Sequence, residues 1–155
     1  MHGVVLGILQ SFTERWDAYC QVMREQHRPI HEQECILDDD SNPYYDVEWL
    51  SNRIRHLPFL PDAFFCANDY LAVCMVKALK KLNVSIPSDI MICGFDDAPE
   101  ATIITPPLTT ICIPSRFMGY IASELLLSRI KHPDMPYRTT YVKTDVVFRA
   151  STNRK

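Results

Sequence analysis

The chain has 155 residues, of which 47% are hydrophobic and 23% charged, and this composition is typical of a globular protein rather than a disordered or fibrous one. The length fits one ordinary domain and leaves little room for two. The formal net charge is −3 and no run of Lys and Arg exceeds two residues. The sequence therefore lacks the clustered basic residues with which proteins bind DNA or an anionic membrane.

The first quarter of the chain predicts a strand, a helix and a weaker strand. The apolar run Val4–Leu9 has no basic residue before it and no small-residue cleavage site after it, so we expect a buried strand and not a signal peptide. A helix is predicted from about Thr13 to Arg28, because apolar residues recur there at the spacing of one helical face. The weaker strand is predicted at Gln33–Leu37.

The middle of the chain repeats this order. Pro43 suits the first position of a helix, whose apolar stripe consists of Val47, Leu50, Ile54 and Leu57. Ala63–Ala67 is a strongly apolar strand, and Asn68 with Asp69 can cap a helix that runs to about Asn83.

The last third predicts three strands and one long helix. Strands are expected at Ile90–Phe95, Thr109–Ile113 and Arg138–Arg149, and Pro114 opens a helix that reaches about Lys131. Strands that alternate with helices over short connections indicate an α/β fold, with a parallel sheet flanked by helices on both faces. Ligands bind such sheets outside the carboxyl ends of the strands.

Asp96 and Asp97 follow the strand Ile90–Phe95 and are the sharpest polar feature at those ends. We expect binding rather than catalysis, because no His, Lys or further carboxylate pairs with them at a mechanistic spacing. Adjacent residues of one turn also tend to point apart. The alternative is a helix-capping turn with one exposed carboxylate.

Other chemistries find little support in the sequence. Asp38-Asp39-Asp40 lacks the alternating spacing of a calcium loop, the five histidines are scattered, and no glycine-rich phosphate loop is present. We therefore expect no catalytic residue, no metal and no cofactor. The six cysteines are irregularly spaced without a C-x-x-C pair, which is typical of reduced, buried thiols and favours a cytoplasmic protein.

The predicted helix after Asn68 is apolar most of the way round. A helix of this kind either has a second partner or is deeply buried, and we favour a subunit interface.

Several stretches together resemble the lac repressor/galactose repressor family of bacterial transcription regulators. The order and spacing match over residues 61–152, and more loosely from His2 onward. The stretches that carry the resemblance are Pro61–Asp69, Ile86–Ile90, Gly94-Phe95-Asp96-Asp97, Thr105–Ile111, Met118-Gly119 with Leu125–Leu127, and Arg149–Thr152.

The resemblance implies an effector-binding domain like the periplasmic sugar-binding proteins (type I), built from two α/β subdomains that the chain links three times. Residues 1–113 and 137–155 would then form the C-terminal subdomain. Residues 114–136 would supply a crossover helix to the mostly absent N-terminal subdomain, and the DNA-binding headpiece would also be absent. Operator DNA would be bound only through that headpiece, and the chain would sense a small sugar-like effector.

The resemblance also implies particular residues. Arg15, Asn68 and Asp96 look like the family's effector contacts, whereas a surface ion pair within its own helix is the alternative for Arg15. Ile113 stands where members often have a polar group, and Asp39 stands near a common ligand-stacking aromatic. Both departures argue against a standard hexose.

A homodimer contact is implied through Val73 and Lys77 on the helix after Asn68, and through Ile104 in the loop after Asp97. Two other classes of function stay open at this point. One is a stand-alone solute-binding module for sugar uptake. The other is a small flavodoxin-like enzyme that uses Asp96 and Asp97.

Overall fold

The computed structural model describes residues 2–6, 10–37 and 43–154. Its centre is a four-stranded parallel sheet in the order β2-β1-β3-β4, formed by β1 (His2–Leu6), β2 (Ile36–Leu37), β3 (Ala63–Cys66) and β4 (Met91–Cys93). The register is continuous, since Val5 of β1 pairs with Ile36 on one side and with Cys66 on the other. The predicted α/β class with a parallel sheet is confirmed.

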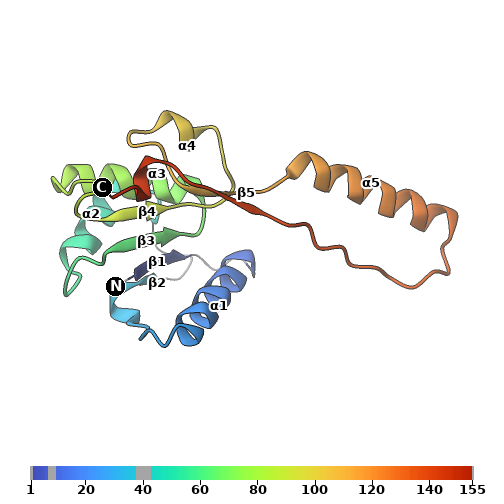
Figure 1. Ribbon diagram of the computed structural model, residues 1–155, viewed down its shortest axis with the longest axis horizontal. Coiled ribbons are helices and arrows are strands. Elements are labelled where there is room, and N and C mark those ends of the chain that lie inside the picture. Colours follow the sequence, from blue (N-terminus) through green and yellow to red (C-terminus); the bar gives the residue numbers. More distant parts are fainter. Residues whose placement is uncertain (1, 7–9, 38–42, 155) are drawn as a thin grey trace.

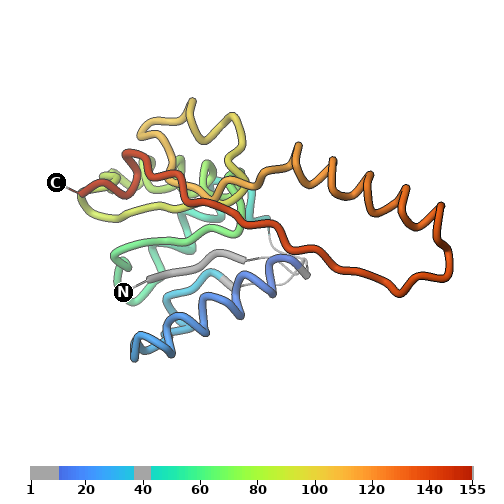
Figure 2. The backbone as a smooth tube through the Cα atoms, turned by 45° about the vertical axis from the view of Figure 1, so that its right-hand side comes forward, coloured from blue at the N-terminus to red at the C-terminus, as the bar shows by residue number. Residues whose placement is uncertain are grey.

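Helices cover both faces of this sheet. The helix α1 (Gln10–Glu25) lies on one face, whereas α2 (Val47–Arg55) and α3 (Asp69–Lys81) pack together on the other (Figures 1 and 2). This arrangement follows from right-handed crossovers between parallel strands, which change face when the strand order reverses. The helix α2 begins later than Pro43 predicted, because the Asp46 side chain caps it by accepting hydrogen bonds from two backbone N–H groups.

The core lies between the sheet and the α2–α3 layer. Phe64 and Ile92 point into it from neighbouring strands and are fully buried. Nine of the thirteen residues of α3 are buried as well, because the sheet, α2 and the short helix α4 (Glu100–Ile103) surround it. Burial within this chain therefore accounts for much of the apolar character for which a subunit interface was expected.

Two predicted strands differ most from the observed elements, and residues 7–9 of the predicted strand Val4–Leu9 lie outside the described residues. The predicted strand Gln33–Leu37 is divided into a 3₁₀ helix, η1 (Glu32–Glu34), and the two-residue β2. The long final strand predicted at Arg138–Arg149 is wrong over most of its length, since only β6 (Asp145–Val147) is a strand. Its partner β5 (Thr110–Cys112) is short, so residues 138–144 have no neighbouring strand to extend the ladder.

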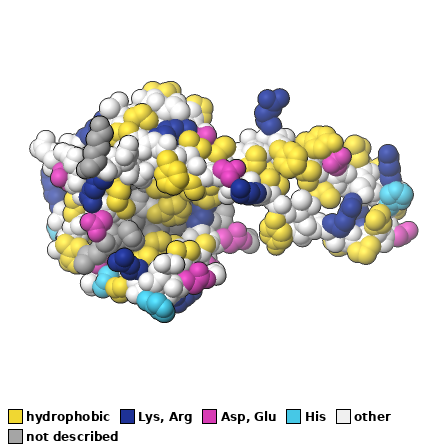
Figure 3. Space-filling view, viewed as in Figure 1, with side chains coloured by type: hydrophobic (Ala, Val, Ile, Leu, Met, Phe, Trp, Pro, Cys, Tyr) yellow, Lys and Arg dark blue, Asp and Glu magenta, His cyan; other side chains and the backbone are white. Residues whose placement is uncertain are grey.

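The antiparallel pair β5–β6 connects the compact part of the chain to a long arm. That arm contains α5 (Ser115–Lys131), which projects away from the sheet and has no buried residue (Figure 1). Hydrophobic side chains gather along its surface (Figure 3), and they include Phe117, Tyr120 and Leu126, each more than half exposed. Within the described ranges, no helix has the length and apolar character needed to cross a membrane.

After β6 the chain returns to the sheet through η2 (Ala150–Thr152). The Ser151 hydroxyl is buried, donates to the carbonyl of Ile92 at 2.6 Å and accepts from the backbone N–H of Thr109 at 2.8 Å. The C-terminal segment is thus tied to β4 and to the entrance of β5.

Candidate functional site

Arg15 and Asp96 come together at the carboxyl edge of the sheet. The Arg15 guanidinium, on α1, lies 3.8 Å from the Asp96 carboxylate and donates to the carbonyl oxygen of Ala67 at the end of β3. It also lies over the Phe95 ring, at 3.8 Å from the ring centroid. Arg15 therefore reaches across the sheet edge. The alternative interpretation of Arg15, an ion pair within its own helix, does not explain these contacts.

Burial affects both charged groups. It lowers the pKa of Arg15, although the nearby Asp96 and Glu14 charges act in the opposite direction. It raises the pKa of Asp96, an effect that Arg15 partly offsets and the Asp69 charge reinforces. The Asp96 side chain is still 42% exposed, so its oxygens can accept hydrogen bonds from a ligand.

Asn68 occupies the same edge as the N-cap of α3. Its side-chain oxygen accepts a hydrogen bond from the backbone N–H of Leu71 at 2.8 Å. Among the described residues, its amide nitrogen has no hydrogen-bond partner, and this nitrogen is the donor that the side chain can offer to a ligand.

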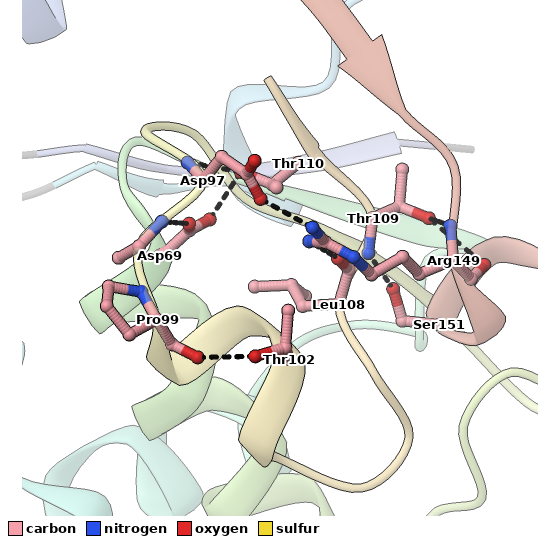
Figure 4. A network of polar contacts seen from close by, with 10 residues as sticks. Asp69, Asp97, Pro99, Thr102, Leu108, Thr109, Thr110, Arg149 and Ser151 are labelled. Carbon is pink, nitrogen blue, oxygen red and sulfur yellow. Dashed lines mark hydrogen bonds and ion pairs between the residues drawn. The ribbon is translucent and has the colours of Figure 1, made fainter. Parts of the chain in front are cut away.

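The two aspartates after β4 point to different partners, as expected for adjacent residues of one turn. Asp96 faces Arg15, whereas Asp97 accepts a 2.6 Å hydrogen bond from the guanidinium of Arg149 (Figure 4). Each of the two carboxylates therefore has its own cationic partner.

A buried carboxylate lies beneath this turn. Asp69 is 1% exposed, accepts from the Thr110 hydroxyl at 2.6 Å, and accepts from the backbone N–H of Ala98 at 2.8 Å (Figure 4). Burial raises its pKa, and these hydrogen bonds partly offset the effect. A Cβ added at Gly94 would lie only 2.1 Å from an Asp69 oxygen, so glycine is required there for space.

Sequence reasoning gave no role at the site to Thr110 or Arg149 and expected Asp69 only to cap a helix. Asp69 and Thr110 are 41 residues apart, and Asp97 and Arg149 are 52 apart. The one local signal was Gly94, a glycine within the predicted apolar strand Ile90–Phe95.

The remaining predicted residues are Ile113, Asp39 and the three expected at the dimer contact. Ile113 is half-buried in the link between β5 and α5, and Asp39 lies outside the described residues. For the expected dimer contact, Val73 is only 8% exposed, Lys77 is exposed and Ile104 is half-buried.

Two hollows lie away from this edge. One, of about 450 Å³, is lined mainly by apolar residues of α1, β3 and β4, including Tyr19 and Phe65. The other, of about 440 Å³, lies beyond the end of α3 beside Lys80. Neither of these two hollows is lined by Arg15, Asn68 or Asp96. No group of three or more His, Cys, Asp or Glu side chains in the described ranges could hold a metal ion.

The α/β fold agrees with the comparisons. The sequence model of the family described as "Periplasmic binding protein-like domain" matches residues 6–152, so the chain is a domain of that class. In solved structures the fold recurs in the complex of the transcriptional regulator CelR with cellobiose (TM-score 0.84, 23% identity, 97% of this chain and 46% of that one). It also recurs in the transcription regulator GntR of Chromobacterium violaceum (TM-score 0.83, 25% identity, 97% and 56%).

Curated relatives show which family of periplasmic-binding-protein-like domains the chain belongs to. The transcriptional repressor PurR of Actinobacillus pleuropneumoniae is 35% identical over 138 residues, which are 88% of this chain and 40% of that protein. The ribose operon repressor of Haemophilus influenzae is 42% identical over 91 residues (59% and 27%), and the lactose operon repressor of Rhizobium radiobacter 37% over 94 residues (61% and 82%). This chain belongs to the lac repressor/galactose repressor family. It spans less than half the length of the PurR relative.

Proposed function

We propose that the chain is the effector-sensing and dimerisation part of a bacterial transcription regulator, usually a repressor, that binds a small sugar-like or related polar ligand. The observation that carries the proposal is the convergence of Arg15, Asn68 and Asp96 at one sheet edge. A guanidinium and an amide nitrogen donate hydrogen bonds, and a carboxylate accepts them from hydroxyl or N–H groups. Such a set suits a polyol or a nucleobase.

The relatives support a regulator over the alternatives. The relatives named as the transcriptional repressor PurR, the ribose operon repressor and the lactose operon repressor are 35%, 42% and 37% identical over the matched residues, and none of these three is named as a transport protein. The engagement of Asp97 by Arg149 argues against the small enzyme. As a regulator, the protein would act in the cytoplasm.

The second part of the proposal concerns the division of the chain. Residues 1–113 and 137–155 form the C-terminal subdomain, and residues 114–136 cross to a second subdomain. The support is the exposed, apolar surface of α5, which a second sheet would bury. The ligand would then lie between two subdomains.

The mechanism that follows is a shift between conformations. A ligand that contacts both subdomains favours their closed arrangement, and the population of DNA-competent dimers changes accordingly. Operator DNA would be bound through a separate N-terminal headpiece. The homodimer would use the surface around Lys77 and Ile104, with Val73 beneath it. The substitution Lys77→Glu would then weaken the dimer in sedimentation equilibrium, and an unchanged dimer would refute this contact.

Isothermal titration calorimetry of the product of the whole reading frame tests the ligand site. Pentoses, hexoses, disaccharides and purines form the panel, and at least one class should give saturable heat. Arg15→Ala should abolish that heat, whereas Arg24→Ala, which changes an exposed arginine of the same helix, should leave it unchanged. Equal binding by the wild type and Arg15→Ala would refute the site.

A further inference from the structure

Arg149 connects the end of the returning strand to the turn that carries Asp96. It follows β6 by two residues, and its guanidinium donates to the Asp97 carboxylate at 2.6 Å and to the carbonyl of Leu108 at 2.8 Å. Both charged side chains are largely shielded, with 17% of Arg149 and 24% of Asp97 exposed. A short, partly shielded pair of this kind contributes more than an exposed ion pair.

The turn that Arg149 holds has an unusual backbone. Asp96 has φ 114° and Asp97 has φ 54°, although neither is glycine. Left-handed backbone is unfavourable for a residue with a side chain, so it persists only where surrounding contacts impose it. At Asp96 the contact is the backbone N–H, which donates to the carbonyl of Ile111 at 3.0 Å.

Asp97 is held from two sides. Its carboxylate is bound by Arg149, and its backbone N–H donates to the Thr110 hydroxyl at 3.3 Å. Thr110 in turn donates to the buried Asp69. The backbone of Asp96 is therefore fixed between Ile111 on β5 and a neighbour that Arg149 anchors.

The same contacts reach the two strands that link the body to the α5 arm. Thr110 and Ile111 belong to β5, which leads out to α5, and Arg149 ends the segment that leads back through β6 (Figure 1). A displacement of the arm would act on both strands, and Arg149 is the side chain that joins the returning segment to the Asp96-Asp97 turn.

We propose that Arg149 is a positioning residue of the ligand site: by binding Asp97 it holds Asp96 in its ligand-facing conformation and couples the β5–β6 connection to that conformation. The proposal rests on the proposed function for its effect on ligand affinity. Its effect on the backbone of Asp96 does not depend on any ligand.

The test compares Arg149→Lys and Arg149→Ala with a control in the same C-terminal segment. Arg154→Ala is the matched control, because Arg154 donates to the carbonyls of Pro87, Ser88 and Asp89, which precede β4 and lie at the opposite edge of the sheet. The product of the whole reading frame is used. The readouts are the Kd for the compound that binds the wild type, the backbone hydrogen exchange of Asp96 and the Tm.

Arg149→Lys retains the charge and should fold, but it loses the two-pronged geometry of the guanidinium. We expect the Kd and the exchange rate at Asp96 each to rise about tenfold, the equivalent of one lost charge-assisted hydrogen bond. Arg149→Ala should raise the Kd and the exchange rate at Asp96 further than Arg149→Lys does. Arg154→Ala should lower the Tm and leave the Kd and the exchange rate at Asp96 unchanged.

The outcomes separate the two proposals. If no compound binds the wild type, the proposed function fails, and the exchange rate at Asp96 still decides whether Arg149 holds the turn. If Arg149→Ala does not fold, the Kd and the exchange rate at Asp96 in Arg149→Lys decide whether Arg149 is a positioning residue. Wild-type exchange at Asp96 in Arg149→Lys, or equal changes of Kd in Arg149→Lys and Arg154→Ala, would overturn the positioning role.

Discussion

Replacing Gly94 by alanine should destabilise the fold through a single atom. The added Cβ would lie 2.1 Å from an Asp69 carboxylate oxygen and 2.9 Å from a methyl group of Leu108. Asp69 cannot yield easily, because it is buried and fixed by hydrogen bonds of 2.6 Å from Thr110 and 2.8 Å from the backbone of Ala98. A shift of the Asp69 carboxylate away from the new Cβ breaks or lengthens both hydrogen bonds.

The magnitude follows from those two hydrogen bonds. Each hydrogen bond to a charged acceptor contributes about 1.5–3 kcal/mol, so losing both lowers the free energy of unfolding by about 3 kcal/mol or more. For a chain of this length that loss corresponds to a Tm lower by about 9 °C.

Urea denaturation followed by tryptophan fluorescence measures the loss, since Trp16 and Trp49 lie half-buried on α1 and α2. Gly119→Ala is the control, because a Cβ at Gly119, on the exposed α5, meets nothing within 4 Å. It should not destabilise the chain, and alanine should favour the helix by about 1 kcal/mol. A Gly94→Ala variant within about 0.5 kcal/mol of wild type would refute the argument from space.

Three further predictions concern single side chains. Asp46→Ala should lower the free energy of unfolding in urea by about 1 kcal/mol through loss of the α2 cap, and an unchanged midpoint would show that the cap contributes nothing. One oxygen of the buried Glu34 carboxylate has no hydrogen-bond partner among the described residues and lies 3.8 Å from the His31 ring nitrogen. Glu34→Gln should raise the free energy of unfolding by about 1 kcal/mol, whereas Glu32→Gln on the exposed side of η1 should have no effect. A destabilised Glu34→Gln would show that the pair with His31 outweighs the cost of burying the charge. Burial raises the pKa of Cys93 to about 11, so iodoacetamide at pH 8 should alkylate it about a hundredfold more slowly in the native than in the urea-unfolded chain, and equal rates by mass spectrometry would show an accessible thiolate.

The elements that sequence reasoning placed well are those with local signals. Periodicity predicted α1, the cap at Asn68 and Asp69 predicted the start of α3, and a continuous apolar run predicted β3. Arg15 and Asp96, which the family resemblance named together as effector contacts, lie 3.8 Å apart at the strand-end edge, and their role in binding stays a prediction. The four-residue α4 was not predicted, because one helical turn has no periodicity to detect.

What the sequence could not indicate are the contacts between distant segments. The role of Arg149 depends on β6 pairing with β5 and returning the chain to the sheet, and no local pattern encodes that pairing. The length of the final strand was overestimated for the same reason, since alternating apolar residues form a strand only beside a partner. The division of the chain at residues 114–136 remains a proposal.

The location of the bound ligand tests the central claim most directly. In a ¹H–¹⁵N NMR titration of the whole reading-frame product with the compound that binds, the largest shifts should occur at the Arg15 side-chain N–H, the Asn68 side-chain amide and the Asp96 backbone N–H. Largest shifts around Tyr19 and Phe65, in the hollow beside α1, or around Lys80 beyond the end of α3, would place the ligand elsewhere and contradict the account.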